Sequence, residues 1–321
     1  MKTAGGDPSQ ASRAVRSRPS ARPCSDGRPT RCGSDKTTLT VVIPVWDEYV
    51  RTMREAIESV LGQAADVAVI VVDNASSQPL PELPLRVELL RLPERLSAGA
   101  ARNAGLARVR TEFVLFLDAD DIVLEGTLPL LLSRMTARPA LSACACGVLA
   151  WNPATGGVRA LDFPSRRTRV MARWPGGYPL YAAMVNRMPT TGCVVMRTVA
   201  AVRAGGFTDS DFAEDWALNV GLAFRGPIDF LPARGRLLRI HGKSLRAQPR
   251  GRAEVARAFD LMRQRVTGDP AAPLIVRLAA PLLALYHRRH ARRLTPGGTT
   301  VPSAALTALG DGGLLATPPS L

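Results

Sequence analysis

The sequence predicts an α/β fold with a Rossmann-like, mostly parallel central sheet flanked by helices. Three continuous apolar runs, Leu39–Val45, Val67–Val72 and Phe113–Leu117, have the length of strands that are buried on both faces. Segments with helical spacing of apolar residues lie between them. Strands that alternate with helices in this way favour parallel pairing.

In order along the chain, the first half contains four expected strands and three helices. The helix after the first strand is indicated by Met53, Ile57, Val60 and Leu61, which recur at helical spacing. The third strand has the weakest pattern. The expected elements are strands at 39–45, 67–72, 87–92 and 113–117 and helices at 51–63, 98–109 and 125–138.

The second half is less regular. Residues 152–187 are rich in Pro, Gly and Arg and show no periodicity, so we expect a long loop on the acceptor side of a binding site. The other expected elements are strands at 141–149, 193–196, 228–231 and 237–240, a helical turn at 199–203, a helix that opens at 212–216, and helices at 254–265 and 274–293.

The positive charge of the chain is concentrated at its ends. The formal net charge is +15, and residues 234–293 alone hold 15 basic and 3 acidic residues. The Arg-, Ser- and Pro-rich tail at 1–37 is expected to be disordered. We therefore expect an electrically balanced central domain at 38–246, a basic helical extension at 247–293 and a loose tail at 294–321.

The basic ends favour some partners over others. Without a series of base-stacking aromatic residues, nucleic acid is not indicated. An anionic membrane surface or a phosphate-bearing substrate fits better, and the helix at 274–293, with leucines beside arginines, predicts peripheral membrane association. A plain helix packed on the domain is the alternative. No signal peptide and no membrane-spanning run is seen, so we expect a cytoplasmic protein, peripheral at the inner face of a membrane.

The five cysteines predict no disulfide framework or metal site. Two of them, Cys24 and Cys32, lie in the tail, while Cys144 and Cys146 alternate in an expected strand. Since no metal-ligand spacing connects them with the three histidines, we interpret them as reduced, structural thiols.

Three carboxylates directly follow the fourth expected strand, in Phe116-Leu117-Asp118-Ala119-Asp120-Asp121. Ligands of open α/β sheets bind at the carboxyl ends of the strands. Crowded carboxylates repel one another unless a cation holds them, and oxygen ligands suit Mg²⁺ or Mn²⁺. Asp118 and Asp120 are therefore candidate metal ligands; a solvated acidic loop is the plain alternative.

No glycine-rich dinucleotide fingerprint follows the first strand, so a nicotinamide or flavin enzyme is not expected. Instead the first strand ends in Pro44-Val45-Trp46-Asp47-Glu48 and the second in Asp73-Asn74, so both lead into polar residues. Such ends can hold a base and ribose by hydrogen bonds. A turn-forming aspartate is the alternative for Asp73.

Two further positions carry chemistry. Glu214 and Asp215 open an expected helix, where acids can also merely complement the helix dipole. His241, in Arg239-Ile240-His241, follows the last expected strand and is either a ligand or a surface histidine.

Taken together, these motifs resemble those of family 2 glycosyltransferases of the GT-A fold. The resemblance spans about residues 38–246, and two motifs depart from the usual pattern, at Trp46-Asp47-Glu48 and at 98–101. The matching motifs are VVIPVWDE (41–48), IVVDNAS (70–76), ARNAGL (101–106), FLDADD (116–121), GGF (205–207), AEDW (213–216) and RIHGKS (239–244).

The resemblance implies an inverting transfer from a nucleotide-diphosphate sugar, with a UDP- or dTDP-linked donor expected because Asp73 can accept from an imide N–H. It implies bacterial-type glycan or glycoconjugate biosynthesis, with Mg²⁺ or Mn²⁺ as cofactor. The implied roles are donor binding by Pro44, Glu48, Asp73, Arg102, Asn103 and Asp118, metal binding by Asp120, Asp118 and His241, and acceptor activation by Asp215, with Glu214 as its alternate.

Two other classes of function stay open. A nucleotidyltransferase uses a related sheet, but normally carries a Gly- and Lys-rich loop after the first strand, and Pro44–Tyr49 has none. A non-catalytic basic module that binds nucleic acid or membrane would leave the acids at 118–121 and 214–215 unexplained, and its affinity for nucleic acid would depend steeply on salt.

Overall fold

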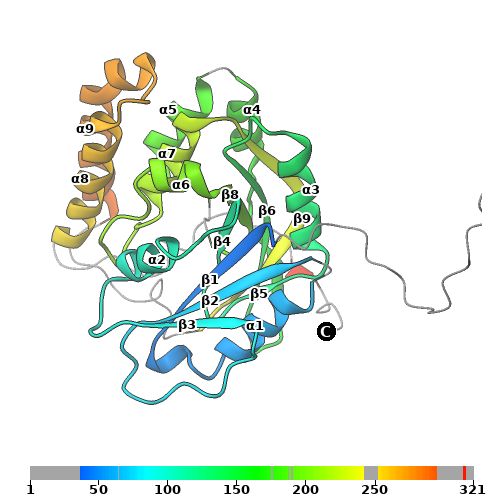
Figure 1. Cartoon of the computed structure of the whole chain (residues 1–321). Coiled ribbons are helices and arrows are strands. Elements are labelled where there is room, and N and C mark those ends of the chain that lie inside the picture. Colours follow the sequence, from blue (N-terminus) through cyan, green and yellow to red (C-terminus); the bar gives the residue numbers. More distant parts are fainter. Residues whose placement is uncertain are drawn as a thin grey trace, which may run out of the picture. The chain divides into compact units, whose positions relative to one another are not determined.

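The computed structural model describes residues 37–63, 65–174, 176–186, 188, 191–241, 252–294 and 314–315. The tail expected to be disordered, and most of the loose tail expected at 294–321, lie outside these residues. Figure 1 shows the described elements, which are β1 (Leu39–Val45), α1 (Met53–Leu61), β2 (Val67–Asp73), β3 (Val87–Arg91), α2 (Ala98–Leu106), β4 (Phe113–Phe116), β5 (Ile122–Val123), α3 (Thr127–Ala137), β6 (Ala143–Trp151), β7 (Val158–Ala160), α4 (Arg166–Arg173), α5 (Gly177–Met184), β8 (Val194–Arg197), α6 (Thr198–Arg203), α7 (Trp216–Arg225), β9 (Ile228–Arg239), α8 (Arg252–Gly268), α9 (Leu274–Leu294) and β10 (Leu314–Leu315).

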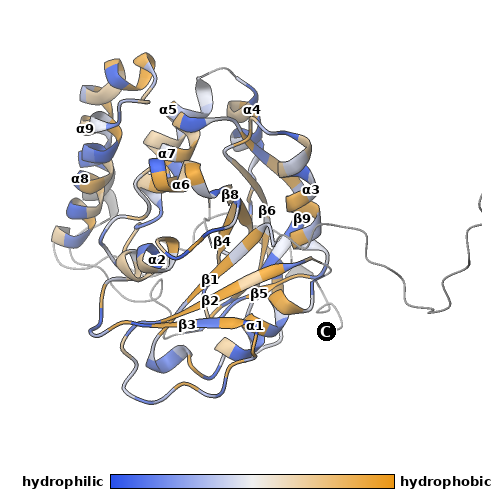
Figure 2. Ribbon diagram, viewed as in Figure 1, coloured by the Kyte–Doolittle hydropathy of each residue, from blue (hydrophilic) through white to orange (hydrophobic). Residues whose placement is uncertain are grey.

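The expected parallel sheet forms the first half of the fold. Its strands lie in the order β4-β1-β2-β3, and all three pairs are parallel. Leu39 in β1 is aligned with Val67 on one side and Phe113 on the other. Figure 2 shows β1 and β2 as mostly hydrophobic, which agrees with strands covered on both faces. The carboxyl ends of β1, β2 and β4 therefore meet at one edge.

Helices cover both faces of this half-sheet. Helix α2 packs on β1 and β2, where a Cβ at Gly105 would lie 2.4 Å from a methyl carbon of Val42, so only glycine permits this approach. Helix α1 lies on the other side of the sheet (Figure 1). Opposite faces are expected, because the chain moves outward from β1 to β2 but returns inward from β3 to β4, and crossovers between parallel strands are almost always right-handed.

The second half of the sheet mixes directions. Strand β8 runs antiparallel to both β4 and β6, whereas β9 runs parallel to β6. The two strands expected at 228–231 and 237–240 form one continuous strand, β9, so that division was wrong. The intervening Pro and Gly do not end the strand, because register shifts opposite Gly147 absorb the irregularity.

The long irregular loop expected at 152–187 was also wrong. This segment contains β7, α4 and α5. Helix α4 is eight residues long and mostly Arg and polar, so it has no apolar periodicity to reveal it. Its N-terminus is set by a cap instead: the Ser165 hydroxyl accepts a hydrogen bond from the Thr168 N–H, 3.1 Å away.

The helices expected in the basic extension are present and packed. The Trp216 ring at the start of α7 lies against Phe259 of α8, with 5.0 Å between centroids, and against His287 of α9 at 5.3 Å. Phe259 and Leu283 belong to the same buried apolar cluster as the strands. Within the described ranges, no helix is both long and apolar enough to cross a bilayer.

Candidate active site

Polar residues gather where the parallel strands end. Asp73, the last residue of β2, is aligned with Val45 at the end of β1, and the chain leaves β4 at Leu117, whose N–H donates to Val42. Asp118 follows directly. The edge of the sheet thus brings together the two acidic strand ends that the sequence placed there.

Asp118 is held by two arginines. Arg102 of α2 donates to Oδ1 at 2.6 Å, and Arg236 of β9 donates to Oδ2 at 2.9 Å. The Thr191 hydroxyl also donates to Oδ2 at 3.0 Å. Burial alone would raise the pKa of Asp118, but the two guanidiniums outweigh it and hold the pKa well below its usual value. Asp118 is therefore a firmly ionised carboxylate.

Arg236 ties three segments together. Its guanidinium is almost fully buried and donates to Asp121, to Asp118 and to the Thr191 carbonyl oxygen, the last at 2.7 Å. Burial raises the pKa of Asp121 to about 7, opposed by the charge of Arg236. Gly192 makes room for this arginine, since a Cβ there would lie 2.7 Å from Arg236 Cδ.

Asp120 has different surroundings. Its Oδ2 lies 2.9 Å from His241 Nε2, and its backbone carbonyl accepts from Arg239 Nε at 2.8 Å. Burial, and then the neighbouring charge of Asp118, raise the pKa of Asp120. The structure therefore brings Asp120 and His241 into contact, as two of the three expected metal ligands.

Glu214 and Asp215 are also neighbouring acids that have different hydrogen-bond partners. Glu214 accepts from Arg102 Nη1 at 2.8 Å, so this arginine bridges Glu214 and Asp118. Burial raises the pKa of Glu214, although Arg102 opposes the shift. Asp215 accepts instead from Asn186 Nδ2 at 2.8 Å. The preceding Ala213 has a φ of 50°, a left-handed conformation that costs on the order of 1 kcal/mol.

Asn103 is used within the protein. Its side-chain amide donates to the Phe207 carbonyl oxygen at 2.9 Å and accepts from the Phe207 N–H at 2.9 Å. A Cβ at Gly206, whose φ is 62°, would lie 2.3 Å from Asn103 Oδ1. In this structure Asn103 therefore fixes the loop that leads to Glu214, and both ends of its amide are occupied.

The expected base-reading residue, Asp73, is fully buried. Its Oδ1 accepts from the Ser76 N–H at 2.9 Å, and Oδ2 forms an ion pair with Arg91 at 3.0 Å. Among the described residues no donor makes a well-directed hydrogen bond to Oδ2. Pro44 is half-buried in β1, and Glu48 is exposed in the 3₁₀ turn that follows.

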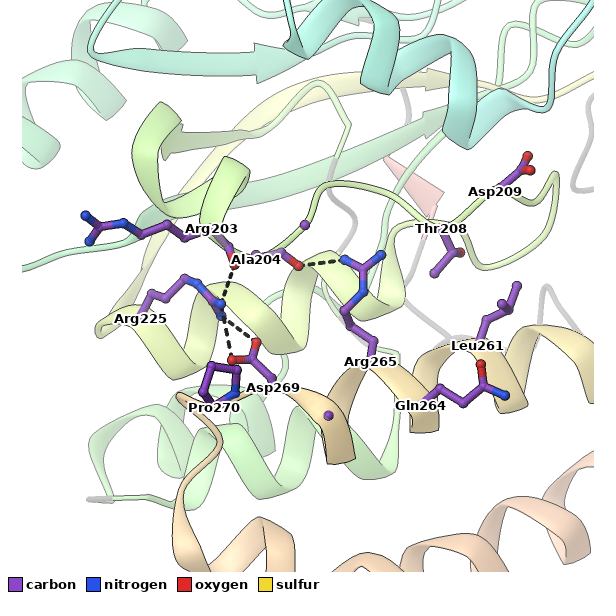
Figure 3. A pocket seen from close by; sticks show the side chains of 12 residues that line it. Arg203, Ala204, Thr208, Asp209, Arg225, Leu261, Gln264, Arg265, Asp269 and Pro270 are labelled. Carbon is purple, nitrogen blue, oxygen red and sulfur yellow. Dashed lines mark hydrogen bonds and ion pairs between the residues drawn. The ribbon is translucent and has the colours of Figure 1, made fainter.

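A hollow of about 550 Å³ lies elsewhere, between α6, α7 and α8 (Figure 3). None of the predicted site residues lines it. Arg265 donates to the Ala204 carbonyl oxygen at 2.6 Å, and Arg225 pairs with Asp269 at 2.7 Å. These side chains provide hydrogen bonds at the carboxyl end of α6 and hold α8 against it. The hollow is therefore a gap where these helices pack.

Sequence reasoning missed three contributors to the site: Thr191, Asn186 and Arg236. The first two fall in the segment that had been expected to be an irregular loop or just after it. Arg236 is one of the 15 basic residues in the stretch 234–293. Only the continuity of β9, which carries it inward beside β5 and β6, distinguishes it from a surface arginine.

Part of this chain is similar to known protein sequences. Residues 40–185 match the profile of Glycosyl transferase family 2. The succinoglycan biosynthesis protein ExoO of Rhizobium meliloti is 37% identical over 95 residues, which cover 28% of this chain and 27% of that protein. The pre-mycofactocin glycosyltransferase of Mycobacterium tuberculosis is 36% identical over 107 residues, which cover 32% and 22%. The chain thus aligns with about a quarter of the length of these relatives.

Solved structures show the same architecture. The structure of S. aureus TarS 1-349 in complex with UDP-GlcNAc superposes with a TM-score of 0.60 at 15% identity, over 80% of this chain and 74% of that one. The GT-A fold expected from the sequence is confirmed by this likeness. Residues 40–185 are identified as a glycosyl transferase family 2 domain.

Proposed function

We propose that the protein transfers a sugar from a nucleotide-diphosphate sugar to an acceptor hydroxyl, with inversion at the anomeric carbon. The observation that carries this proposal is the bridge from Asp118 through Arg102 to Glu214. It places the acids that end a central strand beside the acids that open α7. This bridge supports a proposed donor-binding edge that is linked to Glu214, the residue next to the proposed base, Asp215.

On the donor side, Asp73 and Pro44 would line the nucleoside pocket and Glu48 would lie at its rim. Asp73 Oδ2, which has a charge partner but no directed hydrogen bond among the described residues, suits the imide N–H of uracil or thymine. The likeness to a TarS structure solved with UDP-GlcNAc supports a uridine-linked donor. Asp118, firmly ionised, would accept from a ribose hydroxyl.

On the acceptor side, Asp215 is the proposed base. Glu214 accepts a hydrogen bond from Arg102, whereas Asp215 accepts one from the side-chain amide of Asn186. As the acceptor oxygen bonds to the anomeric carbon, its proton passes to Asp215. The electron pair of the broken C–O bond leaves with the nucleotide diphosphate. A single in-line displacement of this kind inverts the configuration.

A divalent cation fits the residues present. Asp120 and His241 are in contact and offer one carboxylate and one imidazole, while Asp118 forms ion pairs with two arginines. Among the described residues no cluster supplies three protein ligands. Two protein ligands suit Mg²⁺ or Mn²⁺, which take substrate phosphates and waters in their other positions. Bound there, the cation would offset charge on the leaving diphosphate.

The wider setting is part of the same proposal. We propose a cytoplasmic enzyme of bacterial-type glycan or glycoconjugate biosynthesis that associates peripherally with a membrane, as the basic helix α9 led us to expect. Similarity to a succinoglycan biosynthesis protein supports the first part. Nucleic acid is not among the proposed partners.

The proposal is tested by incubating the full chain with a panel of nucleotide sugars and Mn²⁺ and measuring slow release of the free nucleotide diphosphate. We expect hydrolysis of at least one uridine- or thymidine-linked sugar. Release of pyrophosphate from a nucleoside triphosphate and a sugar phosphate would instead support nucleotidyl transfer. Salt-sensitive binding of nucleic acid with no donor turnover would support the non-catalytic alternative.

A further inference from the structure

The outward face of α9 is apolar. Four leucines recur at spacings of four, four and three residues, which places them on one side of the helix. Leu274, Leu278 and Leu282 are 70, 72 and 71% exposed, and Leu285 is exposed as well. The opposite side packs on the protein through Val276, Leu283 and His287, which are buried. We call the four exposed leucines the leucine stripe.

A helix on the surface of a globular protein normally turns charged or polar residues outward. Single exposed leucines are common, but a continuous apolar stripe marks a site of interaction. Exposed Ile275 widens this stripe at its start. The loop with exposed Trp174 lies close by, since a Cβ at Gly176 would lie 4.0 Å from Ile275.

The charge of α9 indicates which kind of partner its exposed face would bind. The sequence of α9 contains five arginines and no acidic residue. The leucine stripe continues along the same face into Arg288 and Arg289, which are exposed. Apolar residues that enter the acyl region, followed by cations that meet phosphate headgroups, are the features of a helix that lies in the interface of an anionic bilayer.

We propose that the leucine stripe inserts into an anionic lipid surface with the axis of α9 in the membrane plane. The inference deepens the proposed membrane association by naming the face that binds, and it does not depend on sugar transfer. A second copy of the chain is disfavoured. Antiparallel pairing would set the arginines at the end of one α9 against a start that carries Arg277 and no acidic residue, and parallel pairing would also oppose like charges.

The test is flotation of the full chain with vesicles. Phosphatidylcholine vesicles with and without about a third of phosphatidylglycerol are compared at low and high salt. We expect binding to the anionic vesicles only, weakened by salt. The affinity of the double variant Leu278→Gln/Leu282→Gln for the anionic vesicles should fall by roughly tenfold or by a larger factor. Its matched control is Val199→Gln/Val202→Gln, at valines of α6 that are 53 and 56% exposed, which should bind like wild type.

Three outcomes would overturn the inference: no binding of wild type to anionic vesicles at low salt, equal binding by the stripe variant, or a concentration-dependent dimer that only this variant abolishes. Thermal unfolding checks that both variants fold. Hydrolysis of the donor without vesicles should be equal in both. Membrane binding can therefore fail while transfer stands, and transfer can fail while membrane binding stands.

Discussion

Asp118 and Asp120 are separated in the chain only by Ala119 and have contrasting surroundings. Asp118 lies 2.6 Å from a nitrogen of Arg102 and is also paired with Arg236, whereas Asp120 lies 2.9 Å from His241. The two guanidiniums compensate Asp118 within the protein. Asp120 is left as the acid whose charge an added cation can offset, so the two aspartates have separate roles in the proposed mechanism.

The first prediction follows from this division. Asp120→Ala removes one of two proposed protein ligands, and should lose most turnover and metal-dependent donor affinity while the protein stays folded. The measurement is donor hydrolysis against Mn²⁺ concentration, with Asp162→Ala, at an exposed acid, as the control. Unchanged rates in a chelator, or in the Asp120 variant, would contradict the metal assignment.

The second prediction concerns stability. Arg236→Met leaves Asp121, whose side chain is fully buried, without its charge partner. Breaking a buried pair in this way costs about 3–5 kcal/mol. Arg134→Met breaks the ion pair with Asp229, in which the arginine is 41% exposed, and should cost less than about 1 kcal/mol. Urea unfolding midpoints compare them; equal midpoints would show that Arg236 does not hold the site together.

Strands β1, β2 and β4 of the parallel half were predictable because each is a largely apolar run followed by polar residues, whereas β3, which contains Glu88 and Arg91, had a weaker pattern. Leu39–Val45 and Val67–Asp73 need no tertiary information to be recognised. The segment at 152–187 was not predictable in this way, since α4 is fixed by the Ser165 cap and by packing rather than by an apolar pattern. The Ser165 cap is a local signal that was overlooked, whereas the packing of α4 depends on contacts that local sequence does not reveal.

The site shows the same limit. Acids that follow strands were predictable, because strand ends meet at one edge of a sheet. Which arginine pairs with which acid was not predictable, since Arg102 and Glu214 are 112 residues apart and Arg236 and Asp118 are 118 apart. Asn103 resembled a donor-binding residue, yet its amide is occupied by Phe207. Its donor-binding role stays a prediction.

The third prediction concerns the base of the donor. If Asp73 accepts from an imide N–H, UDP or dTDP should raise the melting temperature more than CDP, because a ligand that binds the folded state stabilises it by mass action. Asp73→Asn should reduce this difference. Equal stabilisation by all bases would remove Asp73 from base recognition.

The fourth prediction concerns the thiols. Cys144, Cys146 and Cys193 are buried thiols, and burial raises the pKa of Cys144 to about 12. Because the thiolate is the reactive form, iodoacetamide should leave these three cysteines unmodified in the folded protein between about pH 7 and 9. Peptide mapping by mass spectrometry separates them from the other two. Rapid native alkylation of Cys144 would contradict its burial.

The proposed mechanism is tested most directly at Asp215. Asp215→Asn keeps the size of the side chain and removes the base, so turnover should fall by ~10²-fold or more while donor affinity barely changes. Glu214→Gln, which weakens the pair with Arg102, should impair donor binding as well. The measurement is the rate of donor turnover and the donor Kd on the same Asp215→Asn sample. Lost turnover with an unchanged Kd is the predicted result, and full turnover, or a Kd that rises in parallel with the loss, would contradict it.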